Sequence, residues 1–311
     1  MYLYLSEKIK NYYFNNETYY SMIDLNQFIS YFLPKKHDYI ISNFENADIC
    51  VWNMELNNNV DLNNNKNNIL ISIENINYWA KYKKNLDWPG YIHYSKYYEF
   101  DDEKINIYFY NHIHKLIKNE KYLAIPMLYI YIDYFLLNNY KIYPLIEIPF
   151  ENKNFCLVIN KSNLNKDIKH ITSKISFLGD IDNISLYNDI LSNKSCYHSQ
   201  ELINVFNKYK FILCIENSYD DNYITEKIFN CFYSKSIPLY KGSNIINTYI
   251  NQESFINLKD DNFTDTIQKI LNNKDLYYNY INNNKINYNY NNENFHEEYI
   301  SYIEKKIKLL N

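Results

Sequence analysis

The chain has 311 residues and 47% hydrophobic content, which is enough for two domains of about 150 residues each. Its net charge is −4 and it has no basic block, which argues against a nucleic-acid-binding surface, normally marked by a Lys or Arg stripe. The three glycines, at positions 90, 179 and 242, exclude a Gly-rich phosphate loop. A bound nucleotide would therefore be held by side chains and helix ends, and every basic side chain is a lysine, because the sequence contains no arginine.

The cysteine pattern and the apolar runs bear on the compartment. The five cysteines include no Cys-x-x-Cys pair, so neither a zinc site nor a disulfide framework is indicated, and a reducing compartment is expected. The N-terminus lacks a basic region followed by an apolar core, and no apolar run approaches the roughly 20 residues of a membrane span. We therefore expect a soluble, cytoplasmic protein without a signal peptide or transmembrane segment.

Residues 1–145 are interpreted as a first α/β domain. Met22–Phe32 has apolar residues at helical spacing, and Tyr39–Ile41 and Ile49–Trp52 have the composition of short buried strands. Ile69–Ile73 is a further apolar run that predicts a strand.

Glu74 follows that last strand directly, at an edge where open α/β sheets place their ligands. A carboxylate in this position could take the proton of an attacking hydroxyl. Taken alone, however, a Glu after a strand is more often a solvated loop residue. The aromatic and charged segment 79–98 is equally open: it could stack on sugars or be ordinary surface.

Residues 146–311 are interpreted as a second domain. Phe155–Asn160 predicts its first buried strand. Phe211–Ile215 and Ile237–Tyr240 are two more apolar runs, and between them apolar residues recur at helical spacing from Ile224, which together predicts a βαβ unit.

Asp180 and Asp182 form an Asp-x-Asp pair. Such a pair can hold a divalent metal and a nucleotide diphosphate, but it also occurs by chance in acidic loops.

The βαβ unit carries a specific string of residues. It reads Tyr-Lys-Phe-Ile-Leu-Cys-Ile-Glu-Asn-Ser over Tyr209–Ser218, then Tyr-Ile-Thr-Glu-Lys over Tyr223–Lys227, with Pro238 and Gly242 at the next strand. This string resembles the donor-binding signature of the α-1,3-fucosyltransferases, glycosyltransferase family 10. The resemblance implies a GT-B fold, in which two Rossmann-like domains face each other across a cleft. It also implies inverting transfer of L-fucose from GDP-fucose to a hydroxyl of an oligosaccharide or glycoconjugate, without a metal or other cofactor.

The resemblance also implies roles for individual residues. Lys227, at the start of the helix, would neutralise the donor diphosphate, where unpaired backbone N–H groups also favour an anion. Tyr223 and Asn217 would position the phosphates and the sugar, and Glu226 would accept hydrogen bonds from hydroxyl groups. The other expected members of the donor set are Ser218, Thr225 and Gly242.

Two further positions complete the expected site. Glu74 would be the general base, because the family has a Glu after the corresponding strand. Lys169 is the nearest candidate for the position of a family Arg that pairs with the diphosphate. A Lys there provides a point charge without the bidentate fork of Arg.

The remaining expectations concern the end of the chain and the rival functions. Ser254–Leu258 predicts a short strand, residues 264–271 a helix, and Phe295–Leu310 a terminal helix that closes the second domain. The first alternative function is a transferase for another GDP-deoxyhexose. The second is a non-catalytic protein that kept the fold and binds a nucleotide or sugar.

Overall fold

The architecture is taken from a computed structural model of the chain, which divides into two units: Met1–Tyr129 with Asn291–Asn311, and Ile130–Tyr290. This division falls earlier in the chain than the expected boundary near residue 145. The expected closing helix at 295–310 lies outside the described residues. The structure describes residues 1–6, 10, 33, 38–53, 67–72, 107–110, 122–124, 143–160, 166–185, 200–217, 219 and 223–287.

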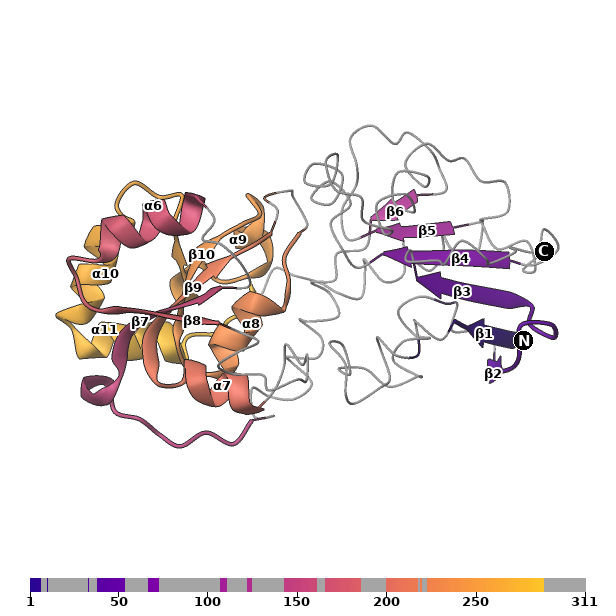
Figure 1. Ribbon diagram of the computed structural model, residues 1–311, viewed down its shortest axis with the longest axis horizontal. Helices are drawn as coiled ribbons and strands as arrows, with labels where there is room; N and C mark the ends of the chain where they lie inside the picture. Colours follow the sequence, from indigo (N-terminus) through magenta and orange to yellow (C-terminus); the bar gives the residue numbers. More distant parts are fainter. Residues whose placement is uncertain are drawn as a thin grey trace. The chain divides into compact units, whose positions relative to one another are not determined.

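The first unit is built on a parallel sheet of six strands in the order β2-β1-β3-β4-β5-β6 (Figure 1). The strands are β1 (Tyr2–Leu5), β2 (Ile40–Ile41), β3 (Ile49–Asn53), β4 (Asn67–Ser72), β5 (Ile107–Tyr110) and β6 (Tyr122–Ala124). Ile49, Val51 and Ile69 are completely buried, as expected of central strands in a parallel sheet. The strands predicted at 49–52 and 69–73 are therefore confirmed, with small shifts at their ends.

Strand β2 corrects one expectation. The apolar run at Tyr39–Ile41 was expected to be buried, yet Ile40 and Ile41 are 57% and 41% exposed. The reason is topological, because β2 is the outermost strand of the sheet, beside β1. A short apolar run does not distinguish a central strand from an edge strand.

The second unit is built on a parallel sheet of five strands in the order β11-β10-β9-β7-β8 (Figure 1). Its strands are β7 (Asn154–Asn160), β8 (Ile181–Ser185), β9 (Tyr209–Ile215), β10 (Ile237–Lys241) and β11 (Ile256–Asn257). The helices among its described residues are α6 (Lys166–Ile175), α7 (Gln200–Phe206), α8 (Glu226–Tyr233), α9 (Ile246–Tyr249), α10 (Phe263–Leu271) and α11 (Lys274–Asn282), with short 3-10 helices at Phe150–Asn152 and Gln252–Ser254.

The predicted βαβ unit is confirmed as β9, α8 and β10, and the helix predicted at 264–271 is α10. The strand predicted over Ser254–Leu258 is shorter than expected. It is limited to Ile256–Asn257, because the chain before it forms a 3-10 turn that ends at Ser254.

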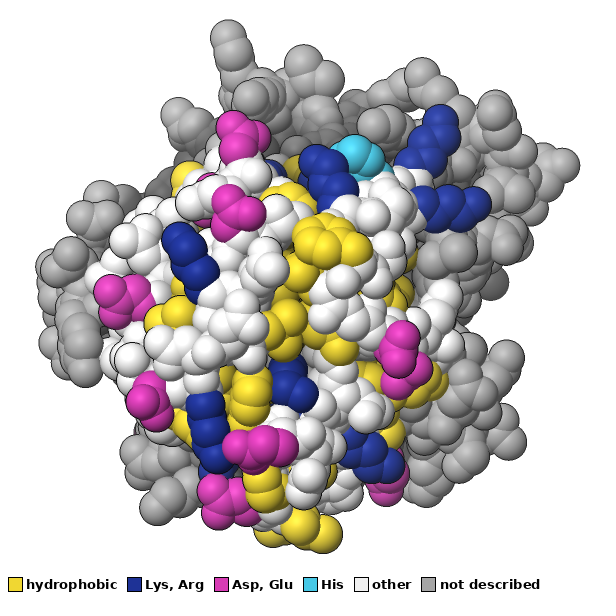
Figure 2. All heavy atoms as spheres, turned by 90° about the vertical axis from the view of Figure 1, so that its left-hand side faces the viewer, with side chains coloured by type: hydrophobic (Ala, Val, Ile, Leu, Met, Phe, Trp, Pro, Cys, Tyr) yellow, Lys and Arg dark blue, Asp and Glu magenta, His cyan; other side chains and the backbone are white. Residues whose placement is uncertain are grey.

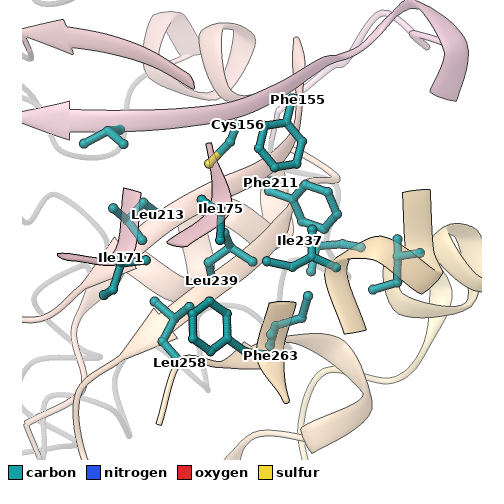
Figure 3. Packing of buried hydrophobic residues seen from close by; sticks show 14 of the residues in the cluster. Phe155, Cys156, Ile171, Ile175, Phe211, Leu213, Ile237, Leu239, Leu258 and Phe263 are labelled. Atoms are coloured by element: carbon teal, nitrogen blue, oxygen red, sulfur yellow. The ribbon is translucent and has the colours of Figure 1, made fainter. Parts of the chain in front are cut away.

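Alternation along the strands divides the second core into two layers. On one face of the sheet, Phe211 and Leu213 of β9 pack against α6, α10 and α11, as Figure 3 shows for part of this cluster. The buried partners from the helices are Ile171, Ile175, Phe263, Ile267, Ile270 and Tyr277. On the other face, Cys214 interacts with Cys231 of α8.

This packing fixes the position of one edge of the sheet. Because all five strands are parallel, the carboxyl ends of β9, β10 and β11 lie along the same edge, with Ile215 directly beside Lys241. Ligands of open α/β sheets bind at this edge.

The surface and the helices add two observations. On the face that carries α10 and α11, Lys side chains gather beside a His at the upper right, and they alternate with carboxylates over the rest of the face (Figure 2). Across the described part of the chain, the helices are too short or too polar to cross a membrane.

Both units contain a parallel sheet, and the predicted α/β fold class is confirmed.

Candidate functional site

Glu216 is the central residue of the carboxyl edge of the second sheet. It follows β9 directly and is 2% exposed. Its Oε1 accepts a hydrogen bond from the backbone N–H of Thr225 at 2.9 Å, and its Oε2 accepts one from the Thr225 hydroxyl at 2.8 Å. Burial raises the pKa of Glu216, and the ammonium of Lys227, 3.4 Å from Oε2, opposes that rise. The carboxylate is thus a buried anchor rather than a ligand-facing group.

Lys227 is fixed by this anchor and by the end of β9. Its Nζ donates to the backbone oxygen of Ile215 at 2.8 Å and to Oδ1 of Asn217 at 3.0 Å. The side chain is nevertheless 29% exposed. A tethered ammonium therefore faces solvent at the carboxyl edge, and little side-chain entropy remains to be lost when an anion binds.

The start of α8 explains why Glu216 and Lys227 lie close together. Thr225 occupies the N-cap position in an extended conformation, but its side chain does not cap the helix. The hydroxyl binds Glu216 instead, so the strand and the helix that follows it are joined at this point. The amides of the first turn and the helix dipole add positive potential beside Lys227.

Gly242 allows β10 to pass close to this anchor. A Cβ at Gly242 would lie 2.7 Å from Cγ of Glu216, and even closer to the hydroxyl oxygen of Tyr240. That oxygen accepts a hydrogen bond from the backbone N–H of Ser243 at 3.2 Å. In the structure, Gly242 thus serves close packing around Glu216, while its expected contact with a donor stays a prediction.

The expected donor residues differ in their exposure. Tyr223, Thr225 and Glu226 are buried, at 3%, 8% and 9% exposure, whereas Asn217 is exposed and supports Lys227. Ser218 lies outside the described residues.

Glu74 and Lys169 are the other two expected positions. Glu74 comes two positions after β4 in the sequence and lies outside the described residues. Lys169 is exposed on α6, and Asp167 is the α6 residue that contacts the edge.

Sequence reasoning missed a second charged group at this edge, which we call the edge cluster: Asp167, Tyr219, Lys241 and Lys259. Lys241 Nζ lies 2.9 Å from Oδ1 of Asp167, and the Tyr219 hydroxyl donates to Oδ2 of the same carboxylate. The ammonium groups of Lys241 and Lys259 lie 5.2 and 5.9 Å from the centroid of the Tyr219 ring, within cation–π range.

Lys259 extends the edge cluster towards the end of β10. It donates to the backbone oxygen of Gly242 and to Oδ1 of Asn244, the latter at 2.7 Å. The four members of the cluster come from four separate segments of the chain, so no local sequence pattern could have revealed it.

The Asp-x-Asp pair lies elsewhere in the second unit. It spans the start of β8, at the amino end of the strand, whereas Glu216 and Lys227 lie at the carboxyl edge. Asp182 accepts a hydrogen bond from the Tyr209 hydroxyl at 2.8 Å and so has a structural partner. Among the described residues, no three His, Cys, Asp or Glu side chains come together as metal ligands.

Each of the two units contains a parallel sheet, as in a GT-B-type fold, and comparison with solved structures agrees. The chain is similar to a "Crystal Structure of alpha1,3-Fucosyltransferase with GDP" with a TM-score of 0.58 and 15% identity, covering 99% of this chain and 90% of that one. A structure of the same title "with GDP-fucose" gives 0.58 and 16% over the same coverage. At this identity the likeness establishes the fold.

The sequence then identifies the family. The model of "Glycosyltransferase family 10 (fucosyltransferase) C-term" matches residues 148–307, just over half of the chain. The chain belongs to glycosyltransferase family 10, as the signature string predicted.

Curated relatives align with the chain in part. "Alpha-(1,3)-fucosyltransferase FucT" of Helicobacter pylori is 38% identical over 93 residues, which is 30% of this chain and 17% of the relative. "Putative fucosyltransferase R654" of Acanthamoeba polyphaga mimivirus is 36% identical over 97 residues, 30% of this chain and 14% of the relative. "4-galactosyl-N-acetylglucosaminide 3-alpha-L-fucosyltransferase 9" of Homo sapiens is 30% identical over 142 residues, 43% and 38%. The chain thus spans less than two fifths of each of these relatives.

Proposed function

We propose that the protein is an inverting glycosyltransferase that moves L-fucose from GDP-fucose to a hydroxyl of an acceptor glycan. The observation that carries the proposal is the tethered Lys227, which holds a partly exposed ammonium at the carboxyl edge where this fold binds ligands. Family membership and the names of the relatives support fucose and GDP as the parts of the donor.

The chemistry of the proposal follows from charge. As the bond between the sugar and the diphosphate breaks, negative charge accumulates on the leaving GDP, and a preorganised cation stabilises it most. Lys227 supplies that cation, and the first amides of α8 lie beside it. Asn217 holds Lys227 in place, while Glu226 and Tyr223 complete the proposed donor set with Ser218, Thr225, Gly242 and Lys169.

The acceptor side of the proposal rests on Glu74. An acceptor hydroxyl is a weak nucleophile, so a carboxylate that takes its proton lowers the barrier to attack. Inversion requires a single displacement, in which this base and the leaving diphosphate act on opposite faces of the sugar.

Metal independence is part of the proposal, because a lysine side chain takes the place of a metal in neutralising the diphosphate. The Asp-x-Asp pair lies at the amino end of β8, whereas Lys227 lies at the carboxyl edge of the sheet. A metal held by this pair would therefore not be beside the diphosphate that Lys227 binds. A chelator such as EDTA is therefore expected to leave the transfer rate unchanged.

We also place the protein in the cytoplasm, supported by the buried free thiols of Cys50, Cys156, Cys214 and Cys231.

The test separates donor binding from catalysis. Lys227→Ala should weaken GDP binding in calorimetry by about 10- to 100-fold, since it removes a charge-assisted contact. Lys269→Ala, at an exposed lysine of α10, is the matched control and should bind GDP normally. Glu74→Gln should bind GDP-fucose normally but lose transfer by about 100-fold or more.

Each outcome has a definite meaning. Unchanged GDP affinity of Lys227→Ala would remove this residue from the donor site, and normal transfer by Glu74→Gln would reject the base. GDP binding without transfer by the unmodified protein would favour the non-catalytic alternative. A thermal-shift panel of GDP-deoxyhexoses would show whether another sugar replaces fucose.

A further inference from the structure

The edge cluster of Asp167, Tyr219, Lys241 and Lys259 adjoins the Lys227 site. The backbone N–H of Glu216 donates to the backbone oxygen of Lys241 at 2.9 Å, so the ends of β9 and β10 are joined directly. Lys259 in turn donates to the backbone oxygen of Gly242, where an added Cβ would lie 2.7 Å from Glu216 Cγ. The two charged groups therefore occupy neighbouring positions on the same edge of the second sheet.

The charges at this edge show why a second group would matter. Lys227 is 3.4 Å from the Glu216 carboxylate, so much of its field is offset by an opposite charge. A diphosphate carries at least two negative charges, and the chain has no arginine to pair with them. A further ammonium beside Lys227 would balance the second phosphate.

The groups around Lys241 and Lys259 explain how the two ammonium groups can lie near the same aromatic ring. The Tyr219 ring places its negative face near both ammonium groups, which reduces their mutual repulsion. The Tyr219 hydroxyl and Lys241 hold the pKa of Asp167 below its usual value, so Asp167 is anionic and offsets Lys241. Lys259, which is exposed, donates to two neutral oxygens.

We propose that Lys241 and Lys259 bind a phosphate group of the nucleoside diphosphate together with Lys227, and that Asp167 competes with this phosphate for Lys241. Tyr219 is then a positioning residue that holds the two lysines at the edge. This inference rests on the proposed function, because it assigns further residues to the same donor site.

Removal of the competing carboxylate should change the affinity for GDP in the opposite direction from removal of either lysine. If Asp167 competes with the phosphate, Asp167→Asn should tighten GDP binding, whereas removal of either lysine should weaken it. A cluster that only stabilises the fold would give losses in all three variants. The Asn side chain keeps an oxygen that can accept from the Tyr219 hydroxyl, so it removes the charge with little change of shape.

The experiment measures affinity for GDP, GMP, guanosine and pyrophosphate by calorimetry. Lys241→Met and Lys259→Met are each expected to weaken GDP and pyrophosphate binding about tenfold, while guanosine binds as before. Their preference for GDP over GMP should fall by a similar factor. Asp167→Asn is expected to bind GDP about threefold more tightly. Lys269→Met, an exposed lysine away from this edge, is the control and should match the unmodified protein.

The outcomes separate this inference from the proposed function. Lys241 and Lys259 variants that bind GDP normally, while Lys227→Ala loses it, would overturn the inference alone, as would weaker binding by a folded Asp167→Asn. Pyrophosphate binding that depends on Lys241 without any GDP binding would overturn only the proposed donor. Binding of neither ligand would overturn both. If Asp167→Asn does not fold, Lys259→Glu decides, because charge reversal at this exposed side chain should weaken GDP binding more than Lys259→Met does.

Discussion

Gly242 is the residue on which the close approach of β10 to Glu216 depends. In Gly242→Ala the new methyl group would overlap the Tyr240 hydroxyl and lie 2.7 Å from Glu216 Cγ. We expect a loss of about 1–3 kcal/mol in the free energy of unfolding, because both neighbours are fully or nearly fully buried and lack room to move. Urea denaturation measures this loss.

A double-mutant cycle identifies the overlap as the cause. Tyr240→Phe removes the oxygen nearest to the new methyl group, so Gly242→Ala should cost less in that background. Equal costs in both backgrounds would contradict the explanation.

Lys285 gives the stability a dependence on pH. Its side chain is buried next to the backbone oxygen of Tyr280, and burial lowers its pKa from 10.5 to about 7. Between these two values the unfolded chain binds more protons at this residue than the folded chain does. The free energy of unfolding should therefore rise with pH across this window, by up to about 1.4 kcal/mol per pH unit.

Lys285→Met isolates that contribution, because the variant keeps an apolar stem and lacks the titrating group. Urea unfolding of both proteins at pH 7, 8 and 9 should give a stability difference that shifts towards the unmodified protein as the pH rises. A difference that is constant with pH would show that Lys285 does not titrate as described.

At the scale of the elements, the junction of β9 and α8 is held by Thr225 through Glu216. Thr225→Val keeps the shape but removes one of the two hydrogen bonds from Thr225 to the buried carboxylate. We expect a loss of about 1.5–3 kcal/mol in the free energy of unfolding, since the bond is to a buried charged group. Thr225→Ser keeps a hydroxyl and should retain most of the stability in the same denaturation assay. A Val variant as stable as the Ser variant would rule out this role.

Elements with a clear apolar pattern could be predicted from the sequence. β9 is recognisable as an unbroken apolar run, because a central strand of a parallel sheet is buried on both faces. α10 is recognisable by its helical spacing, because one face of this helix is buried. α6 has Ile168, Ile171 and Ile175 at helical spacing, but its other seven residues are polar and form no apolar run. The edge strand β8 reads Ile-Asp-Asn-Ile-Ser, in which apolar residues do not alternate with polar ones. β2 shows the opposite case, where apolar residues lie on an exposed edge.

The candidate site divides in the same way. Thr225 and Lys227 could be found because they stand within one continuous signature string around the strand end. The anchoring role of Glu216 needed coordinates, since nothing in the string distinguishes a buried carboxylate from one that faces a ligand. Lys241 and Asp167 are 74 positions apart in the sequence and meet only through the packing of α6 against the sheet.

At the scale of the whole molecule, each unit has its own parallel sheet and buried core, and the proposed donor residues all belong to Ile130–Tyr290. We therefore expect two transitions in scanning calorimetry, with GDP raising the melting temperature of one and leaving the other in place. A ligand at 100 times its Kd adds about 2.7 kcal/mol, which corresponds to roughly 5–10 °C for a domain of this size.

The Lys227→Ala variant assigns the shifted transition to the second unit. Because Lys227→Ala should bind GDP about 10- to 100-fold more weakly, the stabilisation at the same GDP concentration should fall from about 2.7 to about 0.4–1.4 kcal/mol, and the shift of the transition should shrink in proportion. A shift of undiminished size in Lys227→Ala would place GDP elsewhere in the chain. One cooperative transition for the whole chain would show that the two units do not unfold independently, since a shared transition means that the loss of one core removes the other.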